Sequence, residues 1–375
     1  MKPHSVPVLL FILAILLALT TSCGTTTPLQ SGFPPGQSFV YVANDGSQTI
    51  SGFKRDITTG ALTPVQGSPF AADVEPGLWS SSLAVDPKNL MLFALGHKAP
   101  GGQLSVYLIN SDTGALAPAA GSPFNFPAAC STRSISVDPT GRFVYVGTQC
   151  AGILAWQIDR RGRTLVPVPG SPFGNLNAPY NATVDTAGKY LYAAEYTNGI
   201  ETFAIDQSTG SLQLVNGPFY IPHDGPKSII MHPSGNFAYV MGDANDLSLE
   251  LWVCAVIPSD GAVSALERQS GGVPLLALAP DAKFLFTSIG TYGTLTGQPN
   301  LSGSYSAEPL RSLLPSAAAV TPDNRFVFAT VNSPQQSAPG TLSVFRLDET
   351  TGALTPIPGS PYSVGAQPTA VAVTH

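Results

Sequence analysis

Residues capable of acid–base or electrostatic chemistry occur at intervals along the chain, close to the ends of short apolar segments. Groups of this kind that converge in a concave site can move protons or hold a ligand. The candidate ligand-binding residues are His97, Lys98, Arg133, Glu195, Tyr196, His223, Asp224, Lys227, Asp243 and Asp246. Lys227 and Glu195 are also weak candidates for a catalytic role. For any one of them, a solvated loop charge is the alternative interpretation.

Motifs for metal binding or nucleophilic catalysis are missing from the sequence. The five histidines, at 4, 97, 223, 232 and 375, lack the spacing of paired metal ligands. The segment 243–246 offers carboxylate oxygens but lacks the rest of a calcium loop. No Gly-x-Ser-x-Gly sequence is present. We therefore expect no metal and no other cofactor.

The candidate residues belong to a unit that the chain repeats. One copy, residues 134–173, contains four short apolar runs at 134–137, 143–146, 153–158 and 165–168. The turn after the first run recurs with its third residue at 87, 139, 186, 233, 280 and 322. Apolar and aromatic runs between Pro and Gly turns indicate antiparallel strands. Four such strands at a fixed period predict the blades of a propeller.

The ends of the repeat region set the number of blades. The region starts at a second strand, residues 39–42, and finishes at a first strand, residues 369–373. Pairing these two strands would complete a seventh blade and close the ring. We therefore predict an all-β, seven-bladed β-propeller over residues 38–375, present as a monomer. Its loops would bring the candidate residues to one face, around the central channel.

Composition agrees with a turn-rich domain and excludes one class of partner. Charged residues make up 11% of the chain, against about 25% in an average domain. The formal net charge is −6. A nucleic-acid partner is therefore not expected, because that function calls for a basic surface.

Three recurring motifs resemble those of a known family. They are Gly-Arg-Phe-Val-Tyr-Val at 141–146, Thr-Gly-Ala-Leu and Gly-Ser-Pro-Phe. Together they resemble the lactonase-type seven-bladed β-propellers, which include 6-phosphogluconolactonase and muconate-lactonising enzymes, and the related YVTN surface-protein propellers. The resemblance covers residues 39–373. It implies the fold and says little about activity.

The resemblance also implies where a family enzyme would carry its reactive groups. The family's His-rich segment and the Asp-Leu-Gly that follows it are replaced by residues 130–133 and 148–150. Its Gly-Pro-Arg-His becomes Gly225-Pro226-Lys227-Ser228, and the glutamate after that blade's second strand gives way to 242–246. Its Asn-Arg-Gly becomes residues 288–290. By this comparison, most of the reactive side chains of the family's enzymes are absent from this sequence.

The N-terminal residues predict export. An apolar run at 8–19 is typical of a signal peptide, which we place at residues 1–22. Leu19-Thr20-Thr21-Ser22-Cys23 resembles a bacterial lipobox, although its leucine lies four residues before the cysteine instead of three. We expect lipidation of Cys23, a flexible tether over 23–37 and a cell-envelope location, periplasmic or on the outer surface. The protein would then contact the membrane only through the lipid. Plain secretion is the alternative.

The other cysteines are expected to be structural. If Asp138 pairs with Arg142 across the turn, residues whose numbers sum to 280 face each other, and Cys130 and Cys150 meet this condition. An exported protein can keep such a disulfide; two unpaired thiols are the alternative. Cys254 lies in an apolar third strand and is predicted to be buried.

Blade six departs from the repeat. Residues 288–306 are rich in Gly, Thr and Ser and lack the Thr-Gly-Ala-Leu turn. Either a long functional loop or a degenerate repeat fits this segment.

Two functions remain open. The first is a binding module for an unknown small molecule or protein at the channel face, with most catalytic residues of the family lost. The alternative is a sugar-lactone hydrolase of the 6-phosphogluconolactonase type, which would act through Lys227 with Glu195 or Asp243.

Overall fold

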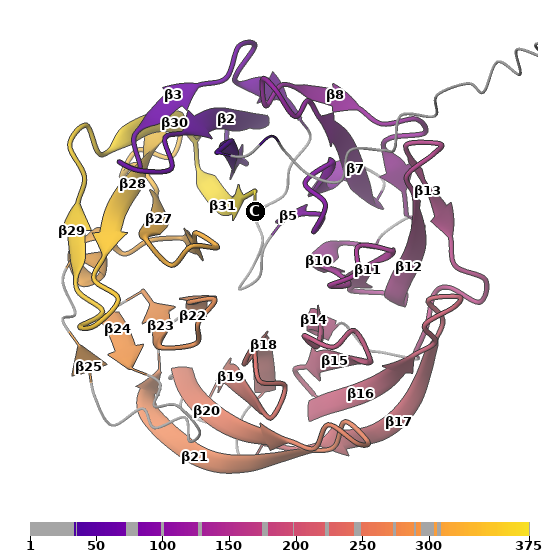
Figure 1. Cartoon of the computed structure of the whole chain (residues 1–375). Coiled ribbons are helices and arrows are strands. Elements are labelled where there is room, and N and C mark those ends of the chain that lie inside the picture. Colours follow the sequence, from indigo (N-terminus) through magenta and orange to yellow (C-terminus); the bar gives the residue numbers. More distant parts are fainter. Residues whose placement is uncertain are drawn as a thin grey trace, which may run out of the picture. The chain divides into compact units, whose positions relative to one another are not determined.

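Seven antiparallel sheets stand around a common centre in the computed structural model (Figure 1). The structure describes residues 34, 36–72, 82–98, 101–126, 130–174, 179–197, 199–221, 225–243, 249–272, 275–288, 290–293, 304–305 and 309–374. All of these belong to one unit, Gly32–His375. The predicted seven-bladed propeller is confirmed.

The first three blades contain these strands, each given from the innermost outward. Blade one consists of β31 (Pro368–Val373), β1 (Ser38–Asn44), β2 (Thr49–Arg55) and β3 (Leu62–Pro64). Blade two consists of β5 (Leu83–Val85), β6 (Met91–Lys98), β7 (Gly101–Ile109) and β8 (Leu116–Pro118). Blade three consists of β10 (Thr132–Val137), β11 (Phe143–Thr148), β12 (Gly152–Asp159) and β13 (Thr164–Pro167).

Blades four to seven continue the pattern. Blade four has β14 (Pro179–Val184), β15 (Tyr190–Glu195), β16 (Gly199–Ile205) and β17 (Leu212–Phe219), and blade five has β18 (Gly225–Met231), β19 (Phe237–Asp243), β20 (Leu249–Val256) and β21 (Val263–Gly272). Blade six has β22 (Leu275–Leu278), β23 (Phe284–Thr287), β24 (Gly290–Gly293) and β25 (Ser304–Tyr305). A one-turn helix, α1 (Leu310–Leu313), precedes blade seven, which has β26 (Ala317–Val320), β27 (Phe326–Val331), β28 (Pro339–Leu347) and β29 (Leu354–Pro356).

The Gly-Ser-Pro-Phe segments return the chain from the fourth strand to the third. In blades one, two and seven the return forms a short extra strand, namely β4 (Phe70–Ala71), β9 (Phe124–Asn125) and β30 (Tyr362–Ala366). The Ser68 hydroxyl accepts a hydrogen bond from the Gly52 amide at 2.9 Å. Ser122, Ser171 and Ser360 accept the equivalent bond, also at 2.9 Å. The motif therefore satisfies a third-strand amide that the short fourth strand does not reach.

The two ends of the repeat region close the ring, as predicted. Strand β31 pairs antiparallel with β1, with Val371 opposite Val42. Thr374 extends this pairing: its amide donates to the Phe39 carbonyl at 2.9 Å, and its hydroxyl accepts from the Phe39 amide at 2.8 Å. The last residues of the chain therefore form the innermost strand of blade one, beside the centre in Figure 1.

Neighbouring blades are joined by a glycine that lies against an aromatic ring. Gly114, in the turn between β7 and β8, has φ +74°, and a Cβ on it would lie 2.3 Å from the Phe39 ring of blade one. The Tyr41 hydroxyl donates to the Gly114 carbonyl at 2.8 Å. Burial raises the pKa of Tyr41, so this hydroxyl keeps its proton. The same ring contact joins Gly60 to Phe326, Gly210 to Phe143 and Gly352 to Phe284.

Blade six is a shortened repeat over its described residues. Residues 290–293 form the third strand and residues 304–305 the fourth. Residues 294–303, on which the two interpretations of this segment differ, lie outside the described part of the chain. No helix within the described ranges is long and apolar enough to cross a membrane.

Two glycines of blade two test the joint between blades. Gly114→Ala places a methyl group against Phe39 and also strains a backbone with positive φ, whereas Gly121→Ala strains a similar backbone (φ +79°) with no heavy atom nearer than 3.5 Å. We expect urea denaturation to show Gly114→Ala less stable than Gly121→Ala by about 1–3 kcal/mol, because overpacking adds to the backbone cost. Equal losses would contradict the proposed joint.

Candidate functional site

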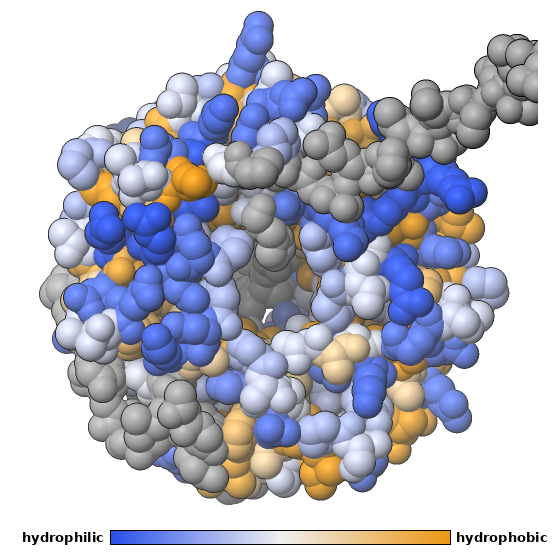
Figure 2. Space-filling model, in the orientation of Figure 1, coloured by the Kyte–Doolittle hydropathy of each residue, from blue (hydrophilic) through white to orange (hydrophobic). Residues whose placement is uncertain are grey.

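The described candidate residues lie where first strands begin and second strands end. Antiparallel pairing brings these two points to the same end of each blade. In blade four, Pro179 at the start of β14 lies opposite Glu195 at the end of β15. In blade five, Gly225 lies opposite Asp243. In these two blades, the described candidate residues therefore lie at the same end of the sheet. Figure 2 shows a hollow at the centre of the ring.

An extra residue interrupts the pairing of the innermost strand near this face in five blades. The register shifts by one between β10 and β11, and equivalent shifts occur in blades four, five, six and one. The extra residues are Arg133, Tyr180, Lys227, Leu276 and Thr369. A β-bulge places two residues of one strand opposite one residue of the other and turns the extra side chain in a new direction. The bulges therefore determine which side chains the innermost strands present on this face.

Three of the bulge residues take part in one continuous set of contacts. The Arg133 guanidinium carbon lies 4.8 Å from the centroid of the Tyr180 ring. The rings of Tyr180 and Tyr196 are 5.8 Å apart. The Lys227 ammonium lies 5.6 Å from the Tyr196 centroid and 2.5 Å from an Asp243 carboxylate oxygen. We call these five residues, from blades three, four and five, the cation–aromatic arc.

The backbone around Tyr196 explains part of the local sequence. A Cβ on Gly225 would lie 2.4 Å from the Tyr196 ring and 2.8 Å from its carbonyl oxygen. Only glycine allows the loop of blade four to pack this closely on the innermost strand of blade five. The Tyr196 side chain remains 40% exposed. It therefore offers an aromatic surface to a ligand.

Charges in the arc are balanced and mostly shielded from water. The side chains of Lys227 and Asp243 are only 14% and 12% exposed. Glu195, next to Tyr196, is completely buried. Lys227 is paired with Asp243, and Arg133 and Glu195 add one charge of each sign, so the formal charge of these four groups is zero. The described part of the site offers polar groups without a surplus of positive charge.

Carboxylates on the opposite face have a structural role. Asp138, in the turn between β10 and β11, accepts from the amides of Arg142 and Phe143 at 2.5 and 2.6 Å. Asp86 and Asp185 cap the equivalent turns. His232 occupies this position in blade five, where its Nδ1 lies 2.8 Å from the Ser234 hydroxyl and burial lowers its pKa. These groups stabilise turns and leave the arc as the candidate site.

The remaining predicted residues are not placed by the structure. His97 and Lys98 belong to β6 at the end that leads into β7, but their side chains are outside the described part. His223, Asp224 and Asp246 also lie outside the described residues. Tyr180 was missed by the sequence interpretation. It stands 47 residues after Arg133 and 47 before Lys227, so the period of the repeat could have identified it.

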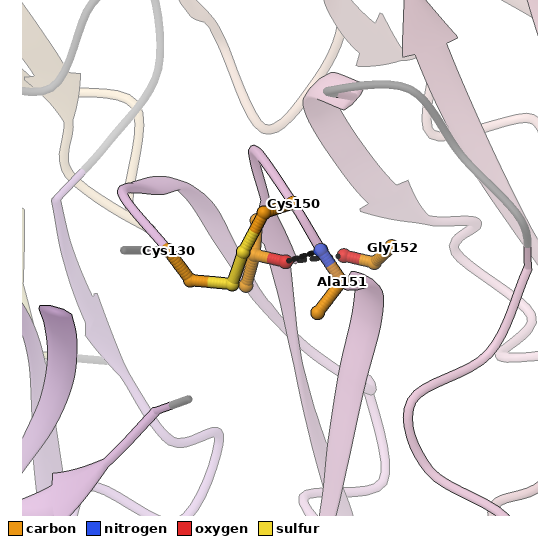
Figure 3. Close-up of a disulfide and its surroundings, with 5 residues drawn as sticks. Cys130, Cys150, Ala151 and Gly152 are labelled. Carbon is orange, nitrogen blue, oxygen red and sulfur yellow. Dashed lines mark hydrogen bonds between the residues drawn. A yellow bond between two sulfur atoms is a disulfide. The ribbon is translucent and has the colours of Figure 1, made fainter. Parts of the chain in front are cut away.

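Cys130 and Cys150 form a disulfide (Figure 3), and Cys130 lies three residues before Arg133 of the arc. The register used to predict it was wrong for most of the hairpin: Ser134 lies opposite Gly147, which gives a sum of 281. The bulge at Arg133 restores the sum of 280 at Thr132 and Thr148. Cys254 is fully buried, and burial raises its pKa to about 12. This thiol is therefore not a nucleophile at neutral pH.

Metal-binding geometry is not found in the described part of the chain. No group of three or more His, Cys, Asp or Glu side chains there could hold a metal ion. The arc contains one carboxylate and two cations, and cations repel a metal. Its chemistry is that of hydrogen bonding, ring stacking and charge complementarity.

Comparison with known proteins supports the fold assignment. Residues 120–224 match the family model described as "Lactonase, 7-bladed beta-propeller". This segment contains four residues of the site: Arg133, Tyr180, Glu195 and Tyr196. No curated protein matches the sequence.

Solved structures of similar shape share little sequence with the chain. A "putative 6-phosphogluconolactonase" from Bacteroides uniformis has a TM-score of 0.68 at 17% identity, covering 90% of this chain and 100% of that one. Another from Bacteroides fragilis has a TM-score of 0.65 at 16% identity, covering 91% and 99%. A hypothetical selenium-binding protein from Sulfolobus tokodaii reaches 0.60 at 10% identity, covering 91% and 92%. Because differently described proteins share this shape, the likeness establishes the fold alone.

Two ion pairs allow the burial of the arc to be tested. Lys227→Met removes the cation from Asp243, which is 12% exposed, and we expect it to lower the free energy of unfolding by about 1–3 kcal/mol. Lys283→Met breaks the more exposed pair with Asp281, joined at 3.2 Å, and should cost less than about 0.5 kcal/mol. Urea denaturation measures both. Similar small losses would show that the arc is solvated.

Proposed function

As a lactonase-like seven-bladed β-propeller, the chain presents its loops on one face of a ring, and we propose that this face binds a small, uncharged, polyhydroxylated ring such as a sugar or a sugar lactone. The observation that supports this is the cation–aromatic arc, in which two adjacent tyrosine rings lie between two cations across three blades. In this proposal the protein is a binding module.

The type of ligand follows from the chemistry of the arc. Sugar rings have apolar C–H faces that pack on aromatic surfaces, and hydroxyl groups that bond to charged side chains. Tyr196, 40% exposed, offers such a surface. A phosphorylated ligand would need a surplus of cations. Lys227 is already paired with Asp243, so the described site favours an unphosphorylated molecule.

Hydrolysis of a sugar lactone is the second candidate. In that reaction water attacks the lactone carbonyl, the ring C–O ester bond breaks, and a hydroxy acid forms. A carboxylate, Glu195 or Asp243, would take the water's proton, and Lys227 would stabilise the oxyanion. The pairing of Lys227 with Asp243 at 2.5 Å favours this candidate, because it places a cation beside a base. Ser228 stands where the family's motif has histidine, which supports binding without turnover.

Binding can be measured by calorimetry with glucose, gluconate and 6-phosphogluconate, using a protein that begins at residue 24. We expect the neutral sugar to bind best, and Tyr196→Ala to weaken it about tenfold by removing the stacking surface. Lys283→Met, remote from the arc, is the control and should bind as the parent does. A preference for 6-phosphogluconate, or equal binding by Tyr196→Ala, would refute the proposed ligand class.

A pH-stat assay with gluconolactone and 6-phosphogluconolactone separates the two candidates. If the protein is a binding module without enzymatic activity, we expect no hydrolysis above the spontaneous rate. Turnover that is lost in Lys227→Met and in either Glu195→Gln or Asp243→Asn, but kept in Lys283→Met, would establish the hydrolase instead.

We further propose that the protein is exported and anchored in the cell envelope through a lipid on Cys23. The signal-like residues 1–22 and the lipobox-like sequence support this. The Cys130–Cys150 disulfide gives independent support, because such bonds persist mainly in oxidising compartments.

Detergent-phase partitioning tests the anchor. Expressed from residue 1 in a bacterium that lipidates exported proteins, the parent should enter the detergent phase, whereas Cys23→Ser should stay in the aqueous phase. Cys254→Ala serves as the control for a cysteine change. Recovery of the parent in the aqueous phase would argue for plain secretion.

A further inference from the structure

Blade four differs from other blades at the residue that follows the Gly-Ser-Pro-Phe segment, which is shortened to Gly-Pro-Phe in blade four and ends in tyrosine in blade seven. In each of the five blades that carry this segment the next residue is exposed. These residues are Ala71, Asn125, Gly174, Tyr220 and Ser363. Among these five blades, only blade four places an aromatic ring there. Tyr220 is 61% exposed, more than Tyr196 of the arc.

Tyr220 lies at the end of blade four that carries the arc. Strand β17 ends at Phe219, which pairs with Ile200, the second residue of β16. Tyr196 directly follows β15, the strand on the other side of β16. In Figure 1, β15, β16 and β17 lie progressively farther from the centre, so Tyr196 is the inner ring and Tyr220 the outer one. Two strand spacings, about 10 Å, separate β15 from β17.

The backbone on both sides of Tyr220 is closely packed. A Cβ on Gly199 would lie 2.3 Å from the Phe219 carbonyl oxygen and 3.2 Å from the Tyr220 Cα. The loop that begins with Tyr196 therefore packs directly on the backbone that carries Tyr220. Ile221, the next residue, is 3% exposed and belongs to the core between blades four and five. The outer ring thus projects from a fixed backbone.

Blade three has the same backbone arrangement without the rings. A Cβ on its Gly152 would lie 2.4 Å from the Phe173 carbonyl oxygen and 2.7 Å from that of Gly174. Gln149 follows the second strand as Tyr196 does in blade four, and Gly174 stands in the place of Tyr220. The fold therefore does not require an aromatic side chain at either position. Exposed aromatic rings that folding does not require mark a binding surface.

We propose that Tyr196 and Tyr220 are two successive stacking positions for a chain of neutral sugar units, which extends from the arc outward over blade four. This inference rests on the proposed function, in which Tyr196 stacks on a sugar ring. A single six-membered ring is too short to cover both side chains, whereas a ligand of linked rings reaches both. Thr197, exposed in the loop after Tyr196, adds a hydroxyl for hydrogen bonding. The ligand class is therefore an oligosaccharide.

Calorimetry against chain length tests the second stacking position. The protein used for the glucose titration is titrated with β-1,4-linked glucose oligomers of one to four units, and with the α-1,4-linked series. We expect Kd in one series to fall about tenfold between one unit and three, because a second ring then stacks. Tyr220→Ala should bind glucose as the parent does but lose this gain. Tyr220→Phe keeps the stacking surface and should keep the gain.

A matched control and the contrary outcomes make the result decisive. Leu214→Ala removes another exposed apolar side chain of β17, 51% exposed, and should bind every oligomer as the parent does. If glucose binds but neither series gains affinity with length, the second position is refuted while the proposed function stands. Equal weakening of glucose and trimer by Tyr220→Ala would also refute it. If no sugar of either series binds, the proposed function fails, and this inference fails with it.

A tyrosine signal tests the contact independently of affinity. In protein with ¹³C-labelled tyrosine rings, the Tyr220 signal is identified by its loss in Tyr220→Phe. We expect saturating trimer to shift this signal and glucose to leave it unchanged, whereas the Tyr196 signal should shift with both. A Tyr220 signal that stays in place with saturating trimer would overturn the proposal even where longer sugars bind more tightly.

Discussion

The contact between a turn glycine and the aromatic ring of the preceding blade joins blade one to two, three to four, six to seven and seven to one. Gly114 leaves room for Phe39, and Tyr41 donates to the glycine's carbonyl. Two of the recurring motifs supply this contact. Thr-Gly-Ala-Leu carries the glycine, and the Phe-Val-Tyr-Val segment carries the phenylalanine and the tyrosine. Because each blade packs on its neighbours, β1 is buried along its whole length. The low content of charged residues follows from that burial, since buried charges need partners.

With the blades fixed in this way, function depends on small departures from the repeat. The bulge position carries Arg133, Tyr180 and Lys227 in three successive blades, but Leu276 in blade six and Thr369 in blade one. The described polar groups therefore form an arc on one side of the centre. A fold shared with proteins of different description does not dictate this asymmetry. The asymmetry comes from the different residues that stand at the bulge position in each blade.

Particular residues show how far sequence reasoning reached. The disulfide was identified although the register assumed for its hairpin was off by one, because the bulge at Arg133 cancels the error. Such a bulge has no clear sequence signal when the residue before it is threonine. Tyr180 was missed because a tyrosine between Pro179 and Asn181 looks like an ordinary strand residue. Ring contacts, unlike turns, depend on residues far apart in the chain.

Apolar runs, turn residues and their period were enough to predict the seven blades and the closing strand. These features are local, since each turn and strand is encoded by adjacent residues. Only the tertiary structure decided that Arg133, Tyr180, Tyr196, Lys227 and Asp243 touch one another. Their contacts cross three blades and depend on bulges that shift the register by one residue. A shift that small redirects a side chain without altering the pattern that encodes the strand.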